Sequence, residues 1–536
     1  MEAFLAAPLT AAVVCLVLGA VASVGDQWHR AIAHCGLILA AAAGGTLTFD
    51  PTYDPGVVRL GGAWESDHLA GLFDLMITCC AAVVLALRPR CSPIALLLGV
   101  TGGFAVVHAS DLVAVYLGLE LASVGLVATI FTSTRSAGRR YAACWVTAFQ
   151  SLFVLLGVVL VYGGVSSTQV RRLGSLTASV FTHWGAVQKY VDSVESGLAL
   201  PAGLLQQFEG KIVTGMAPVA WFLPGILILL AALLLKAGLF PSERAFGGGA
   251  AEAPAVALYR GTILRFASLA AFMRIFVEAL SGPRMLFPPY GWTMAAQWLS
   301  LAGLVFAAIS TFRCRHVQSA MTAAVAAYTS MFVWVLAEAV RGGVGGFPSA
   351  LEARHRADLM VAGAVWGLVV VTMALVGSAA LSGSVGGRPS ASFAAMRGRV
   401  RGDRMLSAST AVFMTAMICA PLIALQGCQG VSPAFDPPIA TWRWLALPLW
   451  AGWGVIVVGQ VRIGRCLFAA PLAARQARGA SPTLRAIVGV AALGIVAVGC
   501  LGAAFPRSLV AVTSGMAYPV GTDARRDAVR ATRVVD

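Results

Sequence analysis

Residues 233–276, "LLLKAGLFPSERAFGGGAAEAPAVALYRGTILRFASLAAFMRIF", place charged side chains inside two runs that are otherwise apolar. Lys236 is the only charged residue between positions 220 and 240, and it is one of only three lysines in the chain. An ammonium group at the centre of an apolar helix costs at least about 2.5 kcal/mol to insert into a bilayer. It therefore requires an acidic partner, a water-filled cavity or a function.

The second half of this stretch predicts an interrupted helix followed by a basic one. Residues 241–254 combine two prolines with three consecutive glycines, which is typical of a helix broken within the membrane. The run 254–279 then carries Arg260, Arg265 and Arg274. Arg260 and Arg274 lie near its ends, where long side chains extend to the headgroups. Arg265 lies at mid-span and is expected to face the interior of the bundle.

The composition of the whole chain is that of a membrane protein. Of 536 residues, 59% are hydrophobic and 11% are charged, and the mean hydropathy is +0.83, whereas soluble domains carry about 25% charged residues. Apolar runs of membrane-spanning length follow one another almost without interruption. We therefore expect an all-α integral membrane protein with no soluble catalytic module.

Charge and cysteine patterns exclude two other classes of function. The net charge of +15 comes from arginines placed singly or in pairs between apolar runs, with no basic face and no stacking aromatic residues for nucleic acid. None of the eleven cysteines shows C-x-x-C spacing, so neither a zinc site nor an iron–sulfur cluster is expected. The sequence predicts no metal, no cofactor in this chain and no nucleic-acid partner.

Windows of about 20 residues with few charges predict about 14 transmembrane helices. They cover residues 3–23, 31–48, 70–87, 92–109, 111–132, 141–163, 218–240, 254–279, 292–312, 317–340, 358–382, 406–426, 442–461 and 483–504. Lys and Arg are concentrated in the loops that follow odd-numbered spans, so those loops are predicted to stay on the side that is not translocated. The loops that follow even-numbered spans then lie on the translocated side.

Glu120 is the natural partner of Lys236. It is the only charged residue in the fifth span, where residues 112–131 read "LVAVYLGLELASVGLVATIF". Each group favours the charged form of the other, while burial favours the neutral form of both, so protonation can switch such a pair. The alternative is a static buried salt bridge. Other acidic residues at membrane depth are Asp74, Glu278 and Glu338.

Two segments resemble a known family. "SDLVAVYLGLELASVGLVATIF", residues 110–131, resembles the fifth helix of subunit 2 of respiratory NADH:quinone oxidoreductase, complex I. Residues 233–276 resemble its seventh and eighth helices, including two basic residues nine apart, here Arg265 and Arg274. "RCRHVQSAMTAAVAAYTSM", residues 313–331, is similar to the tenth helix, though more weakly. The sister subunits 4 and 5 are the runners-up.

The resemblance implies an antiporter-like fold with two inverted repeats, helices 4–8 and 9–13, and with discontinuous helices 7 and 12. It implies a proton pathway through Glu120 and Lys236, with Arg265 as a fixed charge where the family has a lysine, and with Arg140 at the start of the sixth helix. The implied partners are neighbouring antiporter-like and small subunits of the complex I membrane arm, and phospholipids such as cardiolipin.

The expected domains follow that plan. They are residues 1–109 with helices 1–4, residues 110–281 with helices 5–8 as a first half-channel, residues 282–461 with helices 9–13 as a second half-channel, and residues 462–536 with a basic loop, helix 14 and the tail. The first half-channel includes a peripheral insertion at 164–217.

The second half departs from the family pattern. By alignment, the helix-10 histidine of the family falls on Val325, and its helix-12 lysine falls near Cys428. No lysine follows Lys236. An arginine at 265 keeps a positive charge but does not release a proton in turnover. The first half is thus predicted to keep a switchable pair, while the second half lacks titratable bases, with Tyr328, Cys428 or water chains as the remaining substitutes.

The leading hypothesis is a proton-translocating membrane-arm subunit of complex I, subunit 2 type, with a buried Glu–Lys switch. As an enzyme it is expected to be a subunit of NADH:ubiquinone reductase, with no redox chemistry in this chain. One alternative is a structural complex I subunit with an inactive proton channel. Another is a subunit of a related cation/proton antiporter or membrane hydrogenase. The composition and the divergent second half favour the mitochondrial inner membrane, with the bacterial plasma membrane as the alternative.

Overall fold

The structure is a computed structural model, and it describes most of the helical part of the chain. The residues described are 26–49, 57–59, 64–87, 92–133, 137–165, 221–239, 254–280, 291–314, 316–344, 350–383, 403–429, 440–468, 485, 488–489, 492–493 and 495–496. The predicted first span (3–23), the core of the predicted insertion (166–217) and the glycine-rich segment (240–253) lie outside this part.

Helices make up nearly all of the described chain. They are α3 (Asp26–Phe49), α4 (His68–Leu87), α5 (Pro93–Val107), α6 (Leu112–Ser133), α7 (Ala137–Val165), the helix Trp221–Lys236, α11 (Pro254–Tyr259), η2 (Arg260–Leu264), α12 (Arg265–Phe272), η3 (Met273–Ala279), α14 (Trp292–Arg313), α15 (Val317–Val344), α16 (Ala350–Gly383), α18 (Arg404–Gln429) and α19 (Ala440–Phe468). Helices suit an apolar chain in lipid because they satisfy the backbone hydrogen bonds internally.

The predicted spans and the observed helices agree closely. Twelve of the fourteen predicted spans coincide with helices in the described ranges. Among the residues that the structure describes, eight helices are long and apolar enough to cross a membrane, and three shorter apolar helices accompany them. The chain is thus an all-α, multi-pass membrane protein, as predicted. Its thirteenth span is longer than expected, since α19 continues to Phe468.

Two spans differ in detail from the prediction. The eighth is a continuous run of α11, η2, α12 and η3, in which η2 and η3 are π-helical. The break expected in the twelfth span is absent, because α18 (Arg404–Gln429) is one continuous helix. The reason is local: α18 contains one proline and one glycine rather than a glycine run, and a lone proline bends a helix without ending it.

A small β-hairpin lies between α3 and α4 and was not predicted. β1 (Val57–Arg59) pairs antiparallel with β2 (Trp64–Ser66), with Arg59 opposite Trp64. A further bridge joins Trp64 to Ala109, just after α5. The hairpin is thereby attached to the connection between α5 and α6.

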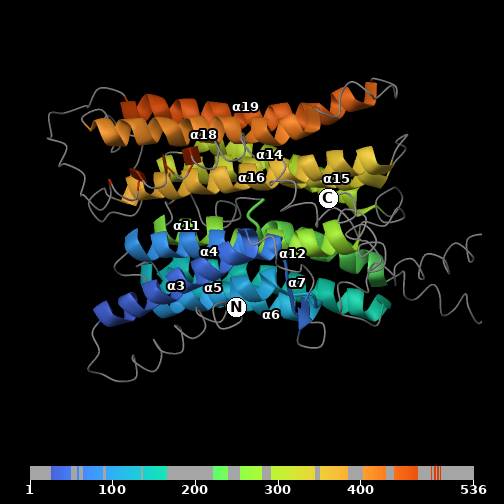
Figure 1. The fold of residues 1–536 in the computed structure, drawn as a ribbon, viewed down its shortest axis with the longest axis horizontal. Helices are drawn as coiled ribbons and strands as arrows, with labels where there is room; N and C mark the ends of the chain where they lie inside the picture. Colours follow the sequence, from blue (N-terminus) through green and yellow to red (C-terminus); the bar gives the residue numbers. More distant parts are fainter. Residues whose placement is uncertain are drawn as a thin grey trace, which may run out of the picture.

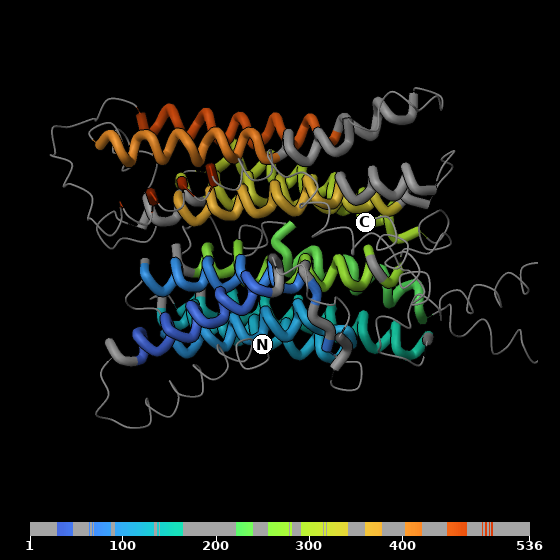
Figure 2. The backbone as a smooth tube through the Cα atoms, in the orientation of Figure 1, coloured from blue at the N-terminus to red at the C-terminus, as the bar shows by residue number. Residues whose placement is uncertain are grey.

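The helices form two sets that lie side by side and nearly parallel (Figure 1). We call the set from α3 to η3 the first half and the set from α14 to α19 the second half. The tube drawn in Figure 2 shows the same division, with the blue-to-green helices below and the yellow-to-orange helices above.

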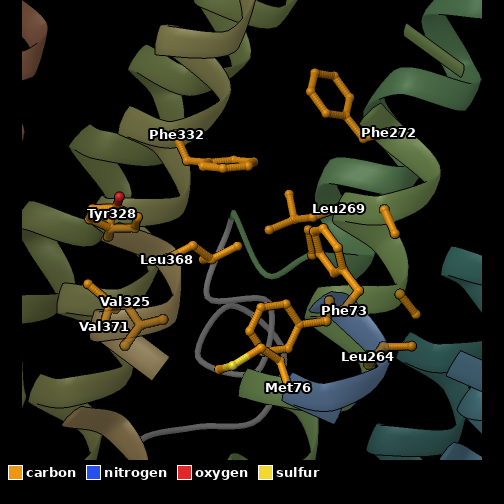
Figure 3. Packing of buried hydrophobic residues seen from close by; sticks show 14 of the residues in the cluster. Phe73, Met76, Leu264, Leu269, Phe272, Val325, Tyr328, Phe332, Leu368 and Val371 are labelled. Atoms are coloured by element: carbon orange, nitrogen blue, oxygen red, sulfur yellow. The ribbon is translucent and has the colours of Figure 1, made fainter. Parts of the chain in front are cut away.

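Apolar side chains join the two halves. Figure 3 shows Phe332 and Leu368 of the second half facing Phe73 and Leu269 of the first half. All four are buried. Within the first half, the ring of Phe73 packs edge-on against Phe266, with centroids 5.6 Å apart. These four side chains therefore belong to an apolar core that joins the halves.

Candidate functional site

Lys236 ends the helix Trp221–Lys236 and points into the first half. Its side chain is fully buried, and Nζ donates to Glu120 Oε1 at 3.2 Å, to Ser123 Oγ at 2.8 Å and to Ser151 Oγ at 3.0 Å. An ammonium group has three N–H bonds, so every donor has an acceptor. The contact predicted between Lys236 and Glu120 is therefore present, and two serines that were not predicted complete it.

The helix geometry explains why these acceptors converge. Glu120 and Ser123 are three residues apart on α6, so they share one face of that helix. Ser151 belongs to α7, and its neighbour Gln150 donates from Nε2 to the carbonyl of Leu235 at 3.4 Å. Two helices thus hold the end of the lysine helix from two sides.

The two ions of the pair have different surroundings. The Glu120 side chain is 29% exposed, while that of Lys236 is fully buried. Val113, Leu117 and Val124 lie on the exposed face of α6 along with it. Loss of the Glu120 charge would leave the Lys236 ammonium in a low-dielectric site with only neutral hydroxyl acceptors, which is costly. The geometry thus couples the charge of the buried lysine to the state of a more accessible carboxyl group.

Arg265 contacts the backbone that follows Lys236. Gly238 adopts a positive φ of 76°, which turns the chain out of the helix. Arg265 Nε donates to the carbonyl of Ala237 at 2.8 Å, and its Nη2 lies 3.0 Å from where a Cβ on Gly238 would be. A cation at a helix C-terminus is favourable. As expected, Arg265 faces the interior; its Nη1 is buried without a hydrogen-bond partner.

Arg140 is placed away from this group. It lies near the start of α7, and its guanidinium carbon is 5.7 Å from the centre of the Phe131 ring. Phe131 follows Glu120 by three turns of α6, about 16 Å along the axis. The structure brings Glu120, Lys236 and Arg265 to one region but leaves Arg140 near the end of α6.

The prediction that Arg274 extends to the headgroups is wrong. Arg274 is buried; its Nε donates to the carbonyl of Val107 at 2.6 Å and its Nη2 to Asp67 Oδ1 at 3.2 Å. The last carbonyls of a helix lack partners within it, and Val107 ends α5. An orphan carbonyl and an acid were therefore closer acceptors than the headgroups. Arg260, in contrast, is only half-buried.

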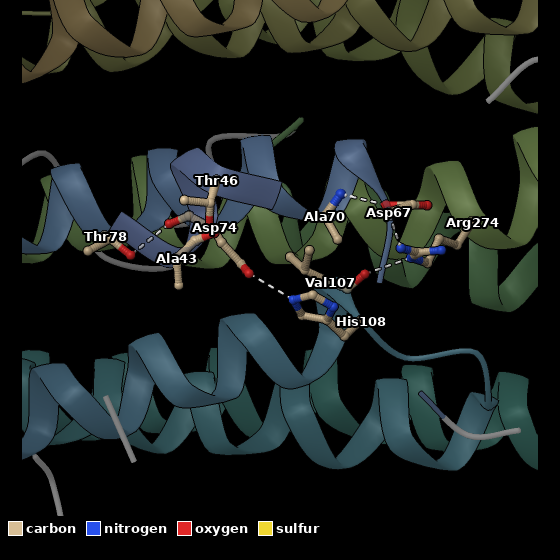
Figure 4. A network of polar contacts seen from close by, with 9 residues as sticks. All are labelled: Ala43, Thr46, Asp67, Ala70, Asp74, Thr78, Val107, His108 and Arg274. Atoms are coloured by element: carbon tan, nitrogen blue, oxygen red, sulfur yellow. Dashed lines mark hydrogen bonds and ion pairs between the residues drawn. The ribbon is translucent and has the colours of Figure 1, made fainter. Parts of the chain in front are cut away.

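A second polar pair was missed by the sequence reasoning. His108 Nε2 lies 2.7 Å from Asp74 Oδ2, and both side chains are fully buried (Figure 4). The Trp64 ring of β2 stacks on the imidazole, with centroids 4.8 Å apart and planes 3° from parallel. A signal was available: the spans 70–87 and 92–109 are joined by a short loop, and Asp74 and His108 each lie about four turns from it.

The second half shows no comparable charge in its described interior. Val325 is buried, and Tyr328 donates from its hydroxyl to the carbonyl of Ala364 at 2.9 Å. Glu338 is half-buried and accepts from Gln297 Nε2. The side chains of Cys428 and Glu278 lie outside the described part. No group of three or more potential metal ligands occurs among the residues that the structure describes.

Solved structures share this architecture. The chain superimposes over 95% of its length on a chain of respiratory complex I from Thermus thermophilus with bound aureothin, with a TM-score of 0.65 and 17% identity, covering 99% of that chain. It matches a chain of the Mrp complex from Dietzia sp. over 97% of its length, with a TM-score of 0.70, 13% identity and 98% of that chain covered. The chain has the antiporter-like fold. A chain of the archaeal membrane-bound sulfane sulfur reductase matches as well, with a TM-score of 0.68, 15% identity and 96% coverage of both chains.

Sequence relatives of this antiporter-like chain match it over a smaller part of its length. It is 27% identical over 222 residues to NADH-quinone oxidoreductase subunit N from Gemmatimonas aurantiaca, which covers 40% of this chain and 34% of the relative. It is 31% identical over 173 residues to the subunit N of Rhizorhabdus wittichii, which covers 28% of this chain and 36% of the relative. The match thus spans about a third of the length of these curated relatives. No protein-family model matches the chain.

Proposed function

We propose that this protein is a proton-translocating membrane subunit of an NADH:quinone oxidoreductase complex, of the subunit 2 type, and that Glu120 and Lys236 form its switch. The observation that carries the proposal is the buried ammonium of Lys236, bonded to a partly exposed carboxylate at 3.2 Å. The names of the two curated relatives support the complex, and the shared fold supports an antiporter-like role.

The proposed switch moves one proton at a time. With Glu120 ionised, Lys236 stays protonated and the pair is neutral. When Glu120 takes up a proton, Lys236 loses its counter-ion and releases a proton from Nζ into the interior. Ser123 and Ser151 hold Nζ in place in both states. Arg265 keeps its charge throughout, so it disfavours a second cation near the end of the lysine helix without itself releasing a proton.

The wider assignment follows from the same proposal. The oxidoreductase reaction belongs to the complex, and no redox cofactor is proposed for this chain. The partners are neighbouring membrane-arm subunits, with phospholipids such as cardiolipin on the outer faces. The curated relatives are bacterial, which supports the bacterial plasma membrane over the mitochondrial inner membrane.

The direct test replaces Lys236 in the intact complex, reconstituted into vesicles. Lys236→Met is expected to lower the number of protons translocated per NADH oxidised, with assembly held equal. Lys236→Arg is the matched control because it keeps the charge but does not release a proton. Lys236→Arg is also expected to pump fewer protons, because the switch requires Nζ to release one. Normal translocation in the arginine variant, or undiminished translocation in Lys236→Met, would overturn the switch.

A structural subunit with an inactive channel is the second candidate. The absence of buried charge in the described interior of the second half favours it. Ordered water reaching both faces through helices α14 to α19, seen in a density map of the complex, would argue against it. An antiporter or membrane hydrogenase subunit is the third candidate, favoured by the fold shared with the Mrp complex. Co-purification of the chain with NADH dehydrogenase activity separates these.

A further inference from the structure

We propose that Asp74 and His108 form a second proton-binding site in the first half, and that the β1–β2 hairpin covers it through Trp64. The site differs in residues and helices from the Glu120–Lys236 pair. Proton exchange at Asp74 and His108 does not depend on the proposed function. Only the use of that exchange in proton translocation rests on the proposed function.

The geometry of the pair is that of a proton-sharing couple. The imidazole edge contacts a carboxylate oxygen at 2.7 Å, and its face lies against the indole of Trp64. Both titratable side chains are completely buried. Burying two ionisable groups costs free energy even when they are paired, and apolar residues of similar volume often stabilise such a site equally well. A buried pair of this kind at membrane depth is a candidate functional site.

Asp74 has unused capacity for a proton. Its Oδ2 contacts His108, but its Oδ1 is buried and has no hydrogen-bond partner among the residues that the structure describes. The nearby hydroxyl of Thr78 donates to the backbone carbonyl of Asp74 and not to the carboxylate. Buried polar atoms are nearly always bonded, so an orphan carboxylate oxygen requires an explanation. A proton on Oδ1 would remove the uncompensated negative charge, and a buried carboxylate charge costs far more free energy than a neutral polar group does.

The other charged groups around the pair largely balance one another. Arg274 on η3 and Asp67 before α4 act electrostatically on Asp74, and they bind each other at 3.2 Å (Figure 4). Asp67 also accepts from the backbone N–H of Ala70, and Asp111 accepts from the N–H of Val113 at the start of α6. The side chains of Glu65 and His68 lie outside the described part. Arg274 and Asp67 form an ion pair, so the charge of this region changes with the protonation of Asp74 and His108.

The location connects the site to one surface. The hairpin bridges to Ala109, just after α5, and Arg274 near the start of η3 binds the carbonyl of Val107 at the end of α5 (Figure 4). The hairpin follows the second span and the connection after α5 follows the fourth, so the charge pattern predicts that both lie on the translocated side. Trp64 is half-buried and bridges to Ala109, which places it between His108 and the exterior. A proton held at this pair would thus lie between the interior of the first half and the translocated face.

A proton fits this site better than a metal ion. The pair offers one imidazole and one carboxylate, and the described residues contain no group of three potential ligands. The step is simple: one proton is shared between Nε2 and Oδ2, a second adds to the pair from water, and it is later returned to water. No other bond forms or breaks.

The test uses pH-difference infrared spectra of the full chain in lipid bilayers. Asp74→Asn and His108→Gln are each expected to remove the same pair of bands, one carboxyl and one imidazole, from the wild-type spectrum. Lys236→Met is expected to keep that pair of bands. Identical spectra in the wild type and both variants would overturn the site. Because this readout does not involve pumping, its failure is distinct from failure of the Glu120–Lys236 switch.

The hairpin is tested separately. Trp64→Ala is expected to speed the response of the pair to a pH jump, and Trp64→Phe, which keeps a stacked ring, is the matched control. Equal rates in all three proteins would overturn the covering role. If the Asp74 and His108 variants do not fold, the wild-type chain labelled at histidine is titrated by NMR. The His108 signal is assigned as the one that shifts when Trp64 is replaced. If that signal does not change with pH, the proposed site is overturned.

Discussion

The two halves of the molecule share a framework but differ in the chemistry they bury. Within the described residues, the Asp, His, Lys and Arg side chains that are almost fully buried all belong to the first half. They are Asp74, His108, Lys236, Arg265 and Arg274. The second half buries only hydroxyl and amide side chains among its described polar residues, and most of the hydroxyls bond to their own helix, as Thr329 and Thr372 do.

One packing device occurs in both halves. Tyr259 donates to the carbonyl of Ala122 at 2.8 Å, and a Cβ on Gly99 would lie 1.6 Å from its hydroxyl oxygen. Tyr328 donates to a carbonyl on α16, and a Cβ on Gly367 would lie 1.9 Å from its hydroxyl oxygen. Each tyrosine thus locks one helix onto the glycine of another. The comparison teaches that helix packing is maintained where the buried charges are absent, so fold alone does not indicate conduction.

The largest expected effect separates the halves by function. Glu120→Gln should lower the protons translocated per NADH oxidised as far as Lys236→Met does, because the switch fails when either member is lost. The double variant should be no worse than either single one, since residues that act as a unit are not additive. Tyr328→Phe, in the second half, should leave the ratio unchanged. An equal loss in the tyrosine variant would break the comparison.

The next effect tests the shared framework. Gly99→Ala and Gly367→Ala should each destabilise the protein by about 1–3 kcal/mol, because the added methyl group overlaps a tyrosine hydroxyl. Thermal unfolding in detergent measures both. Gly45→Ala is the matched control, since nothing lies within 4 Å of its added Cβ. If only the first-half variant is destabilised, the framework is not equivalent in the two halves.

A smaller loss is expected from the tyrosine hydroxyls themselves. Tyr259→Phe and Tyr328→Phe each remove one buried hydrogen bond, which contributes about 1 kcal/mol. Their thermal midpoints should fall by similar amounts. A much larger drop for Tyr259→Phe would mean that the carbonyl of Ala122 also supports the neighbouring Ser123 and the lysine site.

The smallest effect concerns Arg140. Its replacement by alanine should leave proton translocation unchanged, because the guanidinium lies over Phe131, far along α6 from the switch. The cation–π contact with Phe131 that is lost contributes about 0.5–1 kcal/mol. If the alanine variant translocates as few protons as Lys236→Met does, Arg140 takes part in the proton pathway, and that pathway extends along α6 beyond the Glu120–Lys236 pair.

The spans and the central pair could be predicted from sequence because both are local signals. An apolar run of about 20 residues matches the thickness of the bilayer core, so hydropathy identifies the spans. Glu120 and Lys236 are each the only charged residue in such a run. The hairpin was missed because its strands are only three residues long and lack a clear alternation. Such strands form through tertiary contacts, here with Ala109.

The errors at the second polar site have the same origin. His108 directly follows α5, where a polar residue is indistinguishable from an ordinary loop residue, and its partner Asp74 is 34 positions away. Arg274 was assigned to the headgroups because it lies near a span end, yet its acceptors come from α5 and from the residue before α4. Contacts between distant segments decide such positions, and no window of sequence contains them.

The π-helical segments on either side of α12 give the eighth span an internal freedom. Arg265 is the first residue of α12, between η2 and η3. A π turn holds one residue more than an α turn, so its conversion to α shifts the register by one position, a rotation of about 100°. Such a rotation would swing the guanidinium away from the Ala237 carbonyl while both ends of the span stay anchored.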